Sequence, residues 1–103
     1  MLANGPWRSP RVTVATTFRD RFVGMRRGRA EALLLRASSI HGVGLREPLR
    51  IVHLGLDGTV IRQDVLTPGR RLTACGPWIL ELPIGASGPA NGAILTVLPS
   101  SAP

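Results

Sequence analysis

The dipeptide Asp57-Gly58 is the sequence feature that most constrains how this chain can fold. It stands between two strand-like segments, residues 49–54 and 59–65, which are rich in β-branched and aliphatic side chains. An Asp-Gly pair between two such runs is among the strongest short-range signals for a β-hairpin. The sequence therefore predicts a hairpin that spans residues 49–65.

The register of this hairpin is left open by the sequence. A two-residue turn would place Leu54 opposite Ile61. A three-residue loop, with Gly58 in the left-handed region, would place Leu54 opposite Val60. Both pairings are apolar, so the hydrophobic pattern does not choose between them.

Other segments have the alternation or the continuous apolar character of short strands. They lie at residues 11–16, 31–37, 72–74, 78–83 and 93–98. One short helix is predicted near residues 17–26, where Phe18, Phe22 and Met25 recur at helical spacing. Most spacings are too tight for helical crossovers, so we expect a mainly β fold, a small antiparallel sandwich or barrel.

The length of 103 residues fits a single domain, with its core over residues 11–98 and irregular tails at 1–10 and 99–103. No apolar run approaches the roughly 20 residues that cross a bilayer. The first residues also lack the apolar segment of a signal peptide. We therefore expect the chain to be cytoplasmic.

The charge is strongly positive, with 13 basic against 6 acidic residues and a net charge of +7. All the basic residues are arginines, whose guanidinium groups suit phosphate. They are spread along the chain, however, and only two Trp and two Phe could stack on bases. The codon bias of a GC-rich genome, which supplies arginine wherever a positive surface residue is tolerated, therefore explains them better than nucleic-acid binding. The densest group, Arg26, Arg27 and Arg29, is the candidate basic patch.

The single cysteine, Cys75, excludes an intramolecular disulfide and a cysteine-based zinc cage. Its apolar neighbours predict a small buried side chain. The sequence also contains neither a Gly-x-Ser-x-Gly elbow nor a Walker loop. We therefore assign no catalytic residue, no metal ligand and no cofactor from motifs.

The charged residues around the first hairpin strand form the candidate ligand site. In an extended strand, Arg50 faces away from Leu49 and Ile51. Arg50, Arg46 and His41 could then line one polar concavity for a carboxylate, a phosphate or an acidic sugar. The simpler alternative is an exposed strand face on which Glu47 or Asp64 pairs with Arg50.

Several motifs, taken in order, carry a family resemblance. They are Arg21–Met25, Glu31–Leu35, Ser39–His41, Gly44–Leu49, Asp57-Gly58, Pro68–Arg70 and Ile79–Gly85. In this order the sequence resembles the small bacterial and archaeal family called domain of unknown function 192, over roughly residues 11–98. The resemblance implies a jelly-roll β sandwich with one short helix, and it implies no activity.

The chain departs from the family pattern at several positions. Glu47 stands where the family has an aromatic residue, and Arg50 and Gly55 stand where it has aspartates. Near the end, Ala93 replaces another aspartate. The resemblance therefore carries fold, and it carries no carboxylate site to this chain.

These observations favour a binding or accessory module over an enzyme, with an anionic ligand or a protein partner. One alternative is a hydrolase or metal enzyme that uses His41 or His53 with Asp57 or Glu81. A third is nucleic-acid binding through residues 26–29 and 70–71. The oligomeric state is left open.

Overall fold

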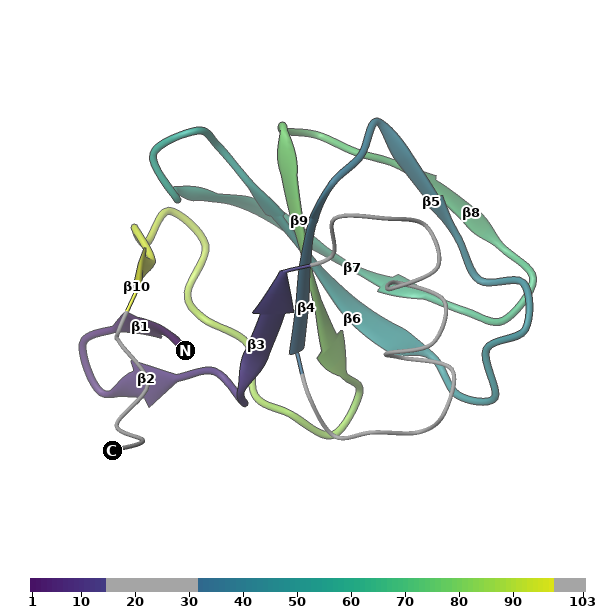
Figure 1. The fold of residues 1–103 in the computed structure, drawn as a ribbon, viewed down its shortest axis with the longest axis horizontal. Coiled ribbons are helices and arrows are strands. Elements are labelled where there is room, and N and C mark those ends of the chain that lie inside the picture. The colour runs from purple at the N-terminus through teal and green to yellow at the C-terminus, as the bar shows by residue number, and fades with distance from the viewer. Residues whose placement is uncertain (15–31, 98–103) are drawn as a thin grey trace.

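The computed structural model describes residues 1–14 and 32–97, and the strands below belong to these ranges (Figure 1). They are β1 (Leu2–Asn4), β2 (Trp7–Arg8), β3 (Val12–Val14), β4 (Ala32–Arg36), β5 (Ser39–His41), β6 (Leu49–Leu54), β7 (Val60–Leu66), β8 (Arg71–Thr73), β9 (Trp78–Pro83) and β10 (Thr96–Val97). The Cα radius of gyration is 12.6 Å. That value is close to the roughly 13 Å expected for a compact domain of this length.

The strands form one main sheet and two small sheets. The main sheet has the order β3-β4-β9-β6-β7, the second sheet has the order β10-β1-β2, and β5 pairs with β8 in a two-stranded ribbon. In the described residues, β3 and β7 end the main sheet without pairing with each other, so it is not a closed barrel. The prediction of a mainly β domain is confirmed.

One pair of strands departs from the predicted antiparallel pattern. β3 and β4 are parallel, with Thr13 opposite Leu33. Parallel neighbours need a connection of a dozen or more residues. Residues 15–31 supply that length, and the argument from tight spacings overlooked this connection.

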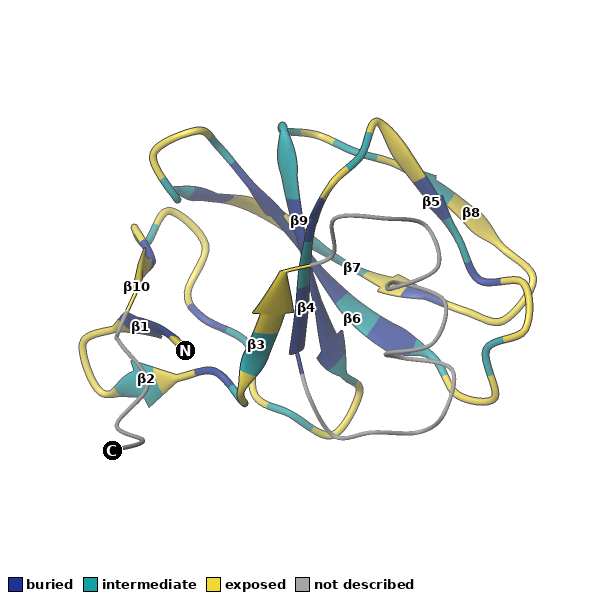
Figure 2. Cartoon of the chain, viewed as in Figure 1, coloured by how far each residue is buried: buried dark blue, intermediate teal, exposed yellow. Residues whose placement is uncertain are grey.

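The main sheet is buried on both faces, because a small sheet covers each one. On one face Val52, Leu54, Leu80 and Leu82 pack with Leu2 of β1. On the other face the apolar residues of β4, β6, β7 and β9 pack with the β5–β8 ribbon. They are Leu33, Leu35, Leu49, Ile51, Leu66 and Ile79, which meet Ile40 and Leu72. Figure 2 shows the buried positions concentrated on β4, β6 and β9.

The β6–β7 hairpin adopts the longer of the two turns left open by the sequence. Leu54 lies opposite Val60, and Gly58 has a φ of 88°. The Asp57 carboxylate Oδ1 accepts the Thr59 amide at 2.9 Å. A β-carbon on Gly58 would also lie 2.7 Å from the Leu95 carbonyl oxygen, so this position requires glycine twice over.

A β-bulge follows this turn. His53 pairs with Arg62 and Leu54 with Val60, so Ile61 is an extra residue in β7. The bulge reverses the alternation of side chains between the two sheet faces for the residues that follow it. Val60 therefore packs with Leu54 on one face of the main sheet, while Leu66 packs on the opposite face.

Several local predictions need correction or lie outside the described residues. Residues 2–4 and 7–8 form strands, so the prediction of an irregular tail over 1–10 is wrong there. The predicted strand over 93–98 is reduced to Thr96–Val97 and a single bridge at Ile94. The helix predicted near 17–26 lies outside the described residues, and the described part of the chain contains no helix. None of the described residues therefore forms a helix able to span a membrane.

Candidate functional site

His53 is the centre of a polar cluster that spans three segments of the fold. Its side chain is fully buried on β6. The Cys75 amide, which follows β8, donates to His53 Nδ1 at 3.1 Å. Because Nδ1 accepts this bond, the ring proton lies on Nε2, which donates to Asp64 Oδ2 at 2.8 Å. His53 thus connects the end of the β5–β8 ribbon to β7.

Asp64 is held on its other side by Arg62. The Arg62 guanidinium lies 3.0 Å from Asp64 Oδ2 through Nε and 3.1 Å from Oδ1 through Nη2. Burial raises the pKa of Asp64, but the hydrogen bonds from His53 and Arg62 outweigh it and leave the pKa below its ordinary value of 3.8. The same pairing raises the pKa of Arg62.

This cluster is saturated by its own hydrogen bonds. Both ring nitrogens of His53 are occupied, so the ring has no nitrogen left for a substrate proton unless Asp64 or Cys75 moves. Glu81 is buried on β9 opposite Ile51, on the face of the main sheet that also carries His53. Within residues 1–14 and 32–97, no three His, Cys, Asp or Glu side chains gather as metal ligands. The cluster therefore has a structural role, in which it links β6 to β7 and to the segment that follows β8.

Asp64→Asn is expected to reduce the loss of stability that the protein shows as the pH falls into the acid range. The depressed pKa of Asp64 means that its stabilisation is complete above about pH 4 and is lost as the pH falls through the lower folded-state value. Urea unfolding between pH 2 and pH 6 should show a shallower loss for Asp64→Asn than for the wild type. Arg62→Ala, which removes one of the two donors, should be intermediate. Equal slopes for wild type and Asp64→Asn would contradict the role assigned to this pair.

The structure separates the residues of the predicted polar concavity. Arg50 does face away from Leu49 and Ile51, as the alternation predicted, and its Nε donates to the Ala86 carbonyl oxygen at 3.2 Å. His41 lies opposite Arg71 on the β5–β8 ribbon, which covers the other face of the sheet. The main sheet thus lies between Arg50 and this ribbon. Ligand binding by either residue stays a prediction.

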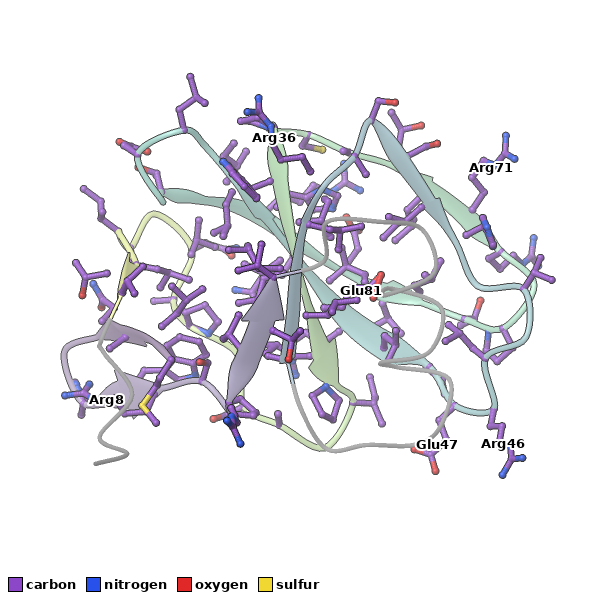
Figure 3. The ribbon with its side chains drawn as sticks, in the orientation of Figure 1. Arg8, Arg36, Arg46, Glu47, Arg71 and Glu81 are labelled. Atoms are coloured by element: carbon purple, nitrogen blue, oxygen red, sulfur yellow. The ribbon has the colours of Figure 1, made fainter. Side chains whose placement is uncertain are left out.

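Four exposed arginines of the described residues lie apart from one another. Arg46 lies beside Glu47 in the loop before β6, and Figure 3 shows Arg8, Arg36, Arg46 and Arg71 pointing outward from four different parts of the molecule. Arg70 is also exposed, in the turn before β8. The candidate basic patch of Arg26, Arg27 and Arg29 lies outside the described residues.

An apolar hollow of about 210 Å³ lies between the β6–β7 turn and the sheet of β1 and β10. We call it the turn hollow, and its walls are Leu2, Leu34, Leu54, Gly55, Leu56, Asp57, Gly58, Trp78, Leu95 and Val97. Leu56 is 80% exposed and Val97 is 76% exposed at its border. The sequence analysis missed this site. An apolar residue at the tip of a Gly-Leu-Asp-Gly turn was the signal that could have revealed it.

Backbone hydrogen bonds hold the walls of the turn hollow in place. The Leu95 amide donates to the Gly58 carbonyl oxygen at 2.9 Å, and the Gly55 amide donates to Thr59 at 2.9 Å. Leu2 pairs with Val97 across β1 and β10. These contacts fix the turn against the C-terminal segment, so the hollow is formed before any ligand arrives.

A second, shallower hollow of about 560 Å³ lies between the turn after β4 and residues 73–77. Arg36 borders it, and its guanidinium carbon lies 5.3 Å from the centre of the Trp78 ring. Cys75 also borders this hollow and is exposed. The prediction of a buried Cys75 is wrong, because the backbone amide turns inward to His53 while the side chain turns outward.

No family model and no curated protein matches this sequence. Among solved structures, the chain is similar to a protein of unknown function from Novosphingobium aromaticivorans DSM 12444, whose crystal structure has a resolution of 1.22 Å. The two share 21% sequence identity with a TM-score of 0.67, over 84% of this chain and 74% of that chain. At this identity the likeness shows a shared fold, and membership of the domain of unknown function 192 family stays a prediction.

Proposed function

We propose that this chain is a small binding module, and that the turn hollow holds an apolar group of its ligand or partner. The observation that carries the proposal is the pair of exposed side chains, Leu56 and Val97, beside apolar walls. Apolar surface removed from water contributes roughly 25 cal/mol per Å². A ligand that covers these side chains would recover that free energy.

The size of the hollow limits what it can hold. Drug-sized ligands occupy pockets of roughly 300–1,000 Å³. At about 210 Å³, the turn hollow suits a single ring, a short alkyl chain or one side chain of a protein partner. Its walls come from β1, β4, β6, β9 and the C-terminal segment. A bound ligand would therefore contact the main sheet and the small sheet of β10, β1 and β2.

The proposal is tested with benzyl alcohol, a neutral probe with one ring. In an NMR titration we expect saturable shifts at the amides of Leu56, Trp78 and Val97. Leu56→Thr should weaken binding about threefold, since it removes exposed apolar wall. Val65→Thr is the matched control, because Val65 is 51% exposed on β7 and does not border the hollow.

Two results would reject the proposal. One is the absence of saturable shifts at these amides. The other is equal binding by the wild type, Leu56→Thr and Val65→Thr, which would place the probe elsewhere.

We also propose a second candidate function, the binding of an anion at the shallower hollow. Arg36 borders this hollow with the hydroxyl groups of Ser38 and Thr73, and a guanidinium beside hydroxyls suits a carboxylate or phosphate. Titration with inorganic phosphate should shift the amides of Ser38 and Thr73. Arg36→Gln should abolish these shifts, while Arg46→Gln should preserve them. Unchanged shifts in Arg36→Gln would reject this function.

The remaining finer assignments are proposals as well. The order of motifs and the main sheet with its covering sheets support a divergent jelly-roll member of the domain of unknown function 192 family. Nucleic-acid binding would use Arg70 and Arg71 in the described part of the chain. It would show an affinity for DNA that falls steeply with salt.

A further inference from the structure

From the charge at its border, we infer that the turn hollow selects a ligand that joins an apolar ring to a protonated amine, with Asp57 as the counter-charge. This inference rests on the proposed binding function and names its ligand class. Of the described residues that line the hollow, Asp57 is the charged one, and the others are apolar residues or glycines. A ligand seated against Leu54 and Trp78 would therefore meet one carboxylate at the border.

The carboxylate is available to a ligand in position and in charge. The Asp57 carboxylate is exposed, and it accepts the Thr59 amide through Oδ1 at 2.9 Å and a hydrogen bond from the Thr59 side chain. Hydrogen bonds from the Thr59 side chain and backbone lower the pKa of Asp57, so it is ionised at neutral pH. A carboxylate has about four lone-pair sites, so these two bonds leave capacity for a further donor, and an ammonium group is the complementary partner of such an exposed carboxylate.

The net charge of +7 does not reverse this preference. At physiological ionic strength, charges are screened beyond about 8 Å. Figure 3 shows Arg8, Arg46 and Arg71 directed to separate parts of the surface. Arg36 lies closer to the hollow, because its guanidinium carbon is 5.3 Å from the ring centre of Trp78, one of the walls. A ligand whose ammonium group is in direct contact with Asp57 therefore experiences the carboxylate more strongly than the guanidinium groups that do not contact it. An anionic ligand would lose affinity through the same contact.

The test compares three probes that share one ring: benzylammonium, benzyl alcohol and benzoate. NMR titration of the full chain at low salt should give the affinity order benzylammonium, benzyl alcohol, benzoate. We expect the advantage of the amine over the alcohol to be about two- to fivefold, as for an exposed ion pair. Added salt should reduce this advantage.

Asp57→Asn should remove the advantage of the amine while benzyl alcohol binds as before. Asparagine keeps the Oδ1 acceptor for the Thr59 amide, and thermal unfolding checks that the turn is intact. Glu47→Gln is the matched control, because Glu47 is an exposed carboxylate that does not border the hollow. This control should retain the preference for the amine.

The possible outcomes separate this inference from the proposed function. If amine and alcohol bind equally, if benzoate binds best, or if the preference survives in Asp57→Asn, the inference fails and the hollow remains a binding site. If none of the three probes binds there, both fail. If sedimentation shows a dimer, and the amide signals of Leu56 and Val97 shift in NMR spectra as the dimer forms, a second copy occupies the hollow. That result would overturn the inference.

Discussion

Gly76→Ala is expected to destabilise the protein by about 2–3 kcal/mol, the upper part of the range for forcing extra atoms into a packed site. The added β-carbon would overlap the carbonyl oxygen of Leu54 and lie 2.9 Å from its carbonyl carbon. It would also lie 2.9 Å from Ile61 Cδ1. Since two of these atoms belong to the backbone of β6, a simple side-chain rotation cannot relieve the contact.

Thermal unfolding provides the measurement. For a domain of this size, a loss of 1 kcal/mol lowers Tm by about 4–8 °C, so Gly76→Ala should unfold roughly 10–20 °C lower. Gly85→Ala is the matched control, because no atom lies within 4 Å of its added β-carbon. The control should stay within about 0.5 kcal/mol of the wild type. If both variants have the same Tm as the wild type, the close approach of Gly76 to β6 is refuted.

His53→Ala is expected to cost about 3–5 kcal/mol, through an internal cavity and two lost hydrogen bonds. The Cys75 amide and the Asp64 carboxylate would both lose a partner. Arg62→Ala removes a guanidinium from the same cluster, but that side chain is 60% exposed. It should therefore cost far less stability than His53→Ala.

Urea unfolding gives the two free energies, and hydrogen exchange locates the effect. The Cys75 amide should lose protection in His53→Ala and keep it in Arg62→Ala. His53→Gln, which retains a side chain that can hydrogen-bond, should be intermediate in stability. A Cys75 amide that stays equally protected in His53→Ala would show that the ring does not hold this segment.

The sequence predicted the elements whose signals are local. The strands at residues 49–54 and 78–83 were placed with the observed bounds, because each is a nearly continuous apolar run. β1 and β2 were missed, because Asn4-Gly5-Pro6 reads as irregular chain. The pairing of β1 with β10, in which Leu2 lies opposite Val97, joins segments far apart in sequence, and no local sequence pattern predicts it.

The sites were harder to predict, because they depend on register. Alternation along one strand correctly gave the direction of Arg50. The neighbours of His41 and His53 depend on pairing between strands. His41 lies opposite Arg71, from a strand about thirty residues later in the chain. The Asp64 partner of His53 depends on the register between β6 and β7, which the sequence left open between two turns, and on a bulge at Ile61 that the sequence did not predict.

The extra residue in β7 also affects how this chain should be compared with distant relatives. Residues before Ile61 and residues after it follow the inside–outside alternation in opposite phase. A relative without the bulge would need the inverted order of apolar and polar residues over positions 62–66 to fill the same core. A sequence alignment without a one-residue gap at Ile61 would then match inward side chains of one chain with outward side chains of the other. Allowing that gap would recover the correspondence.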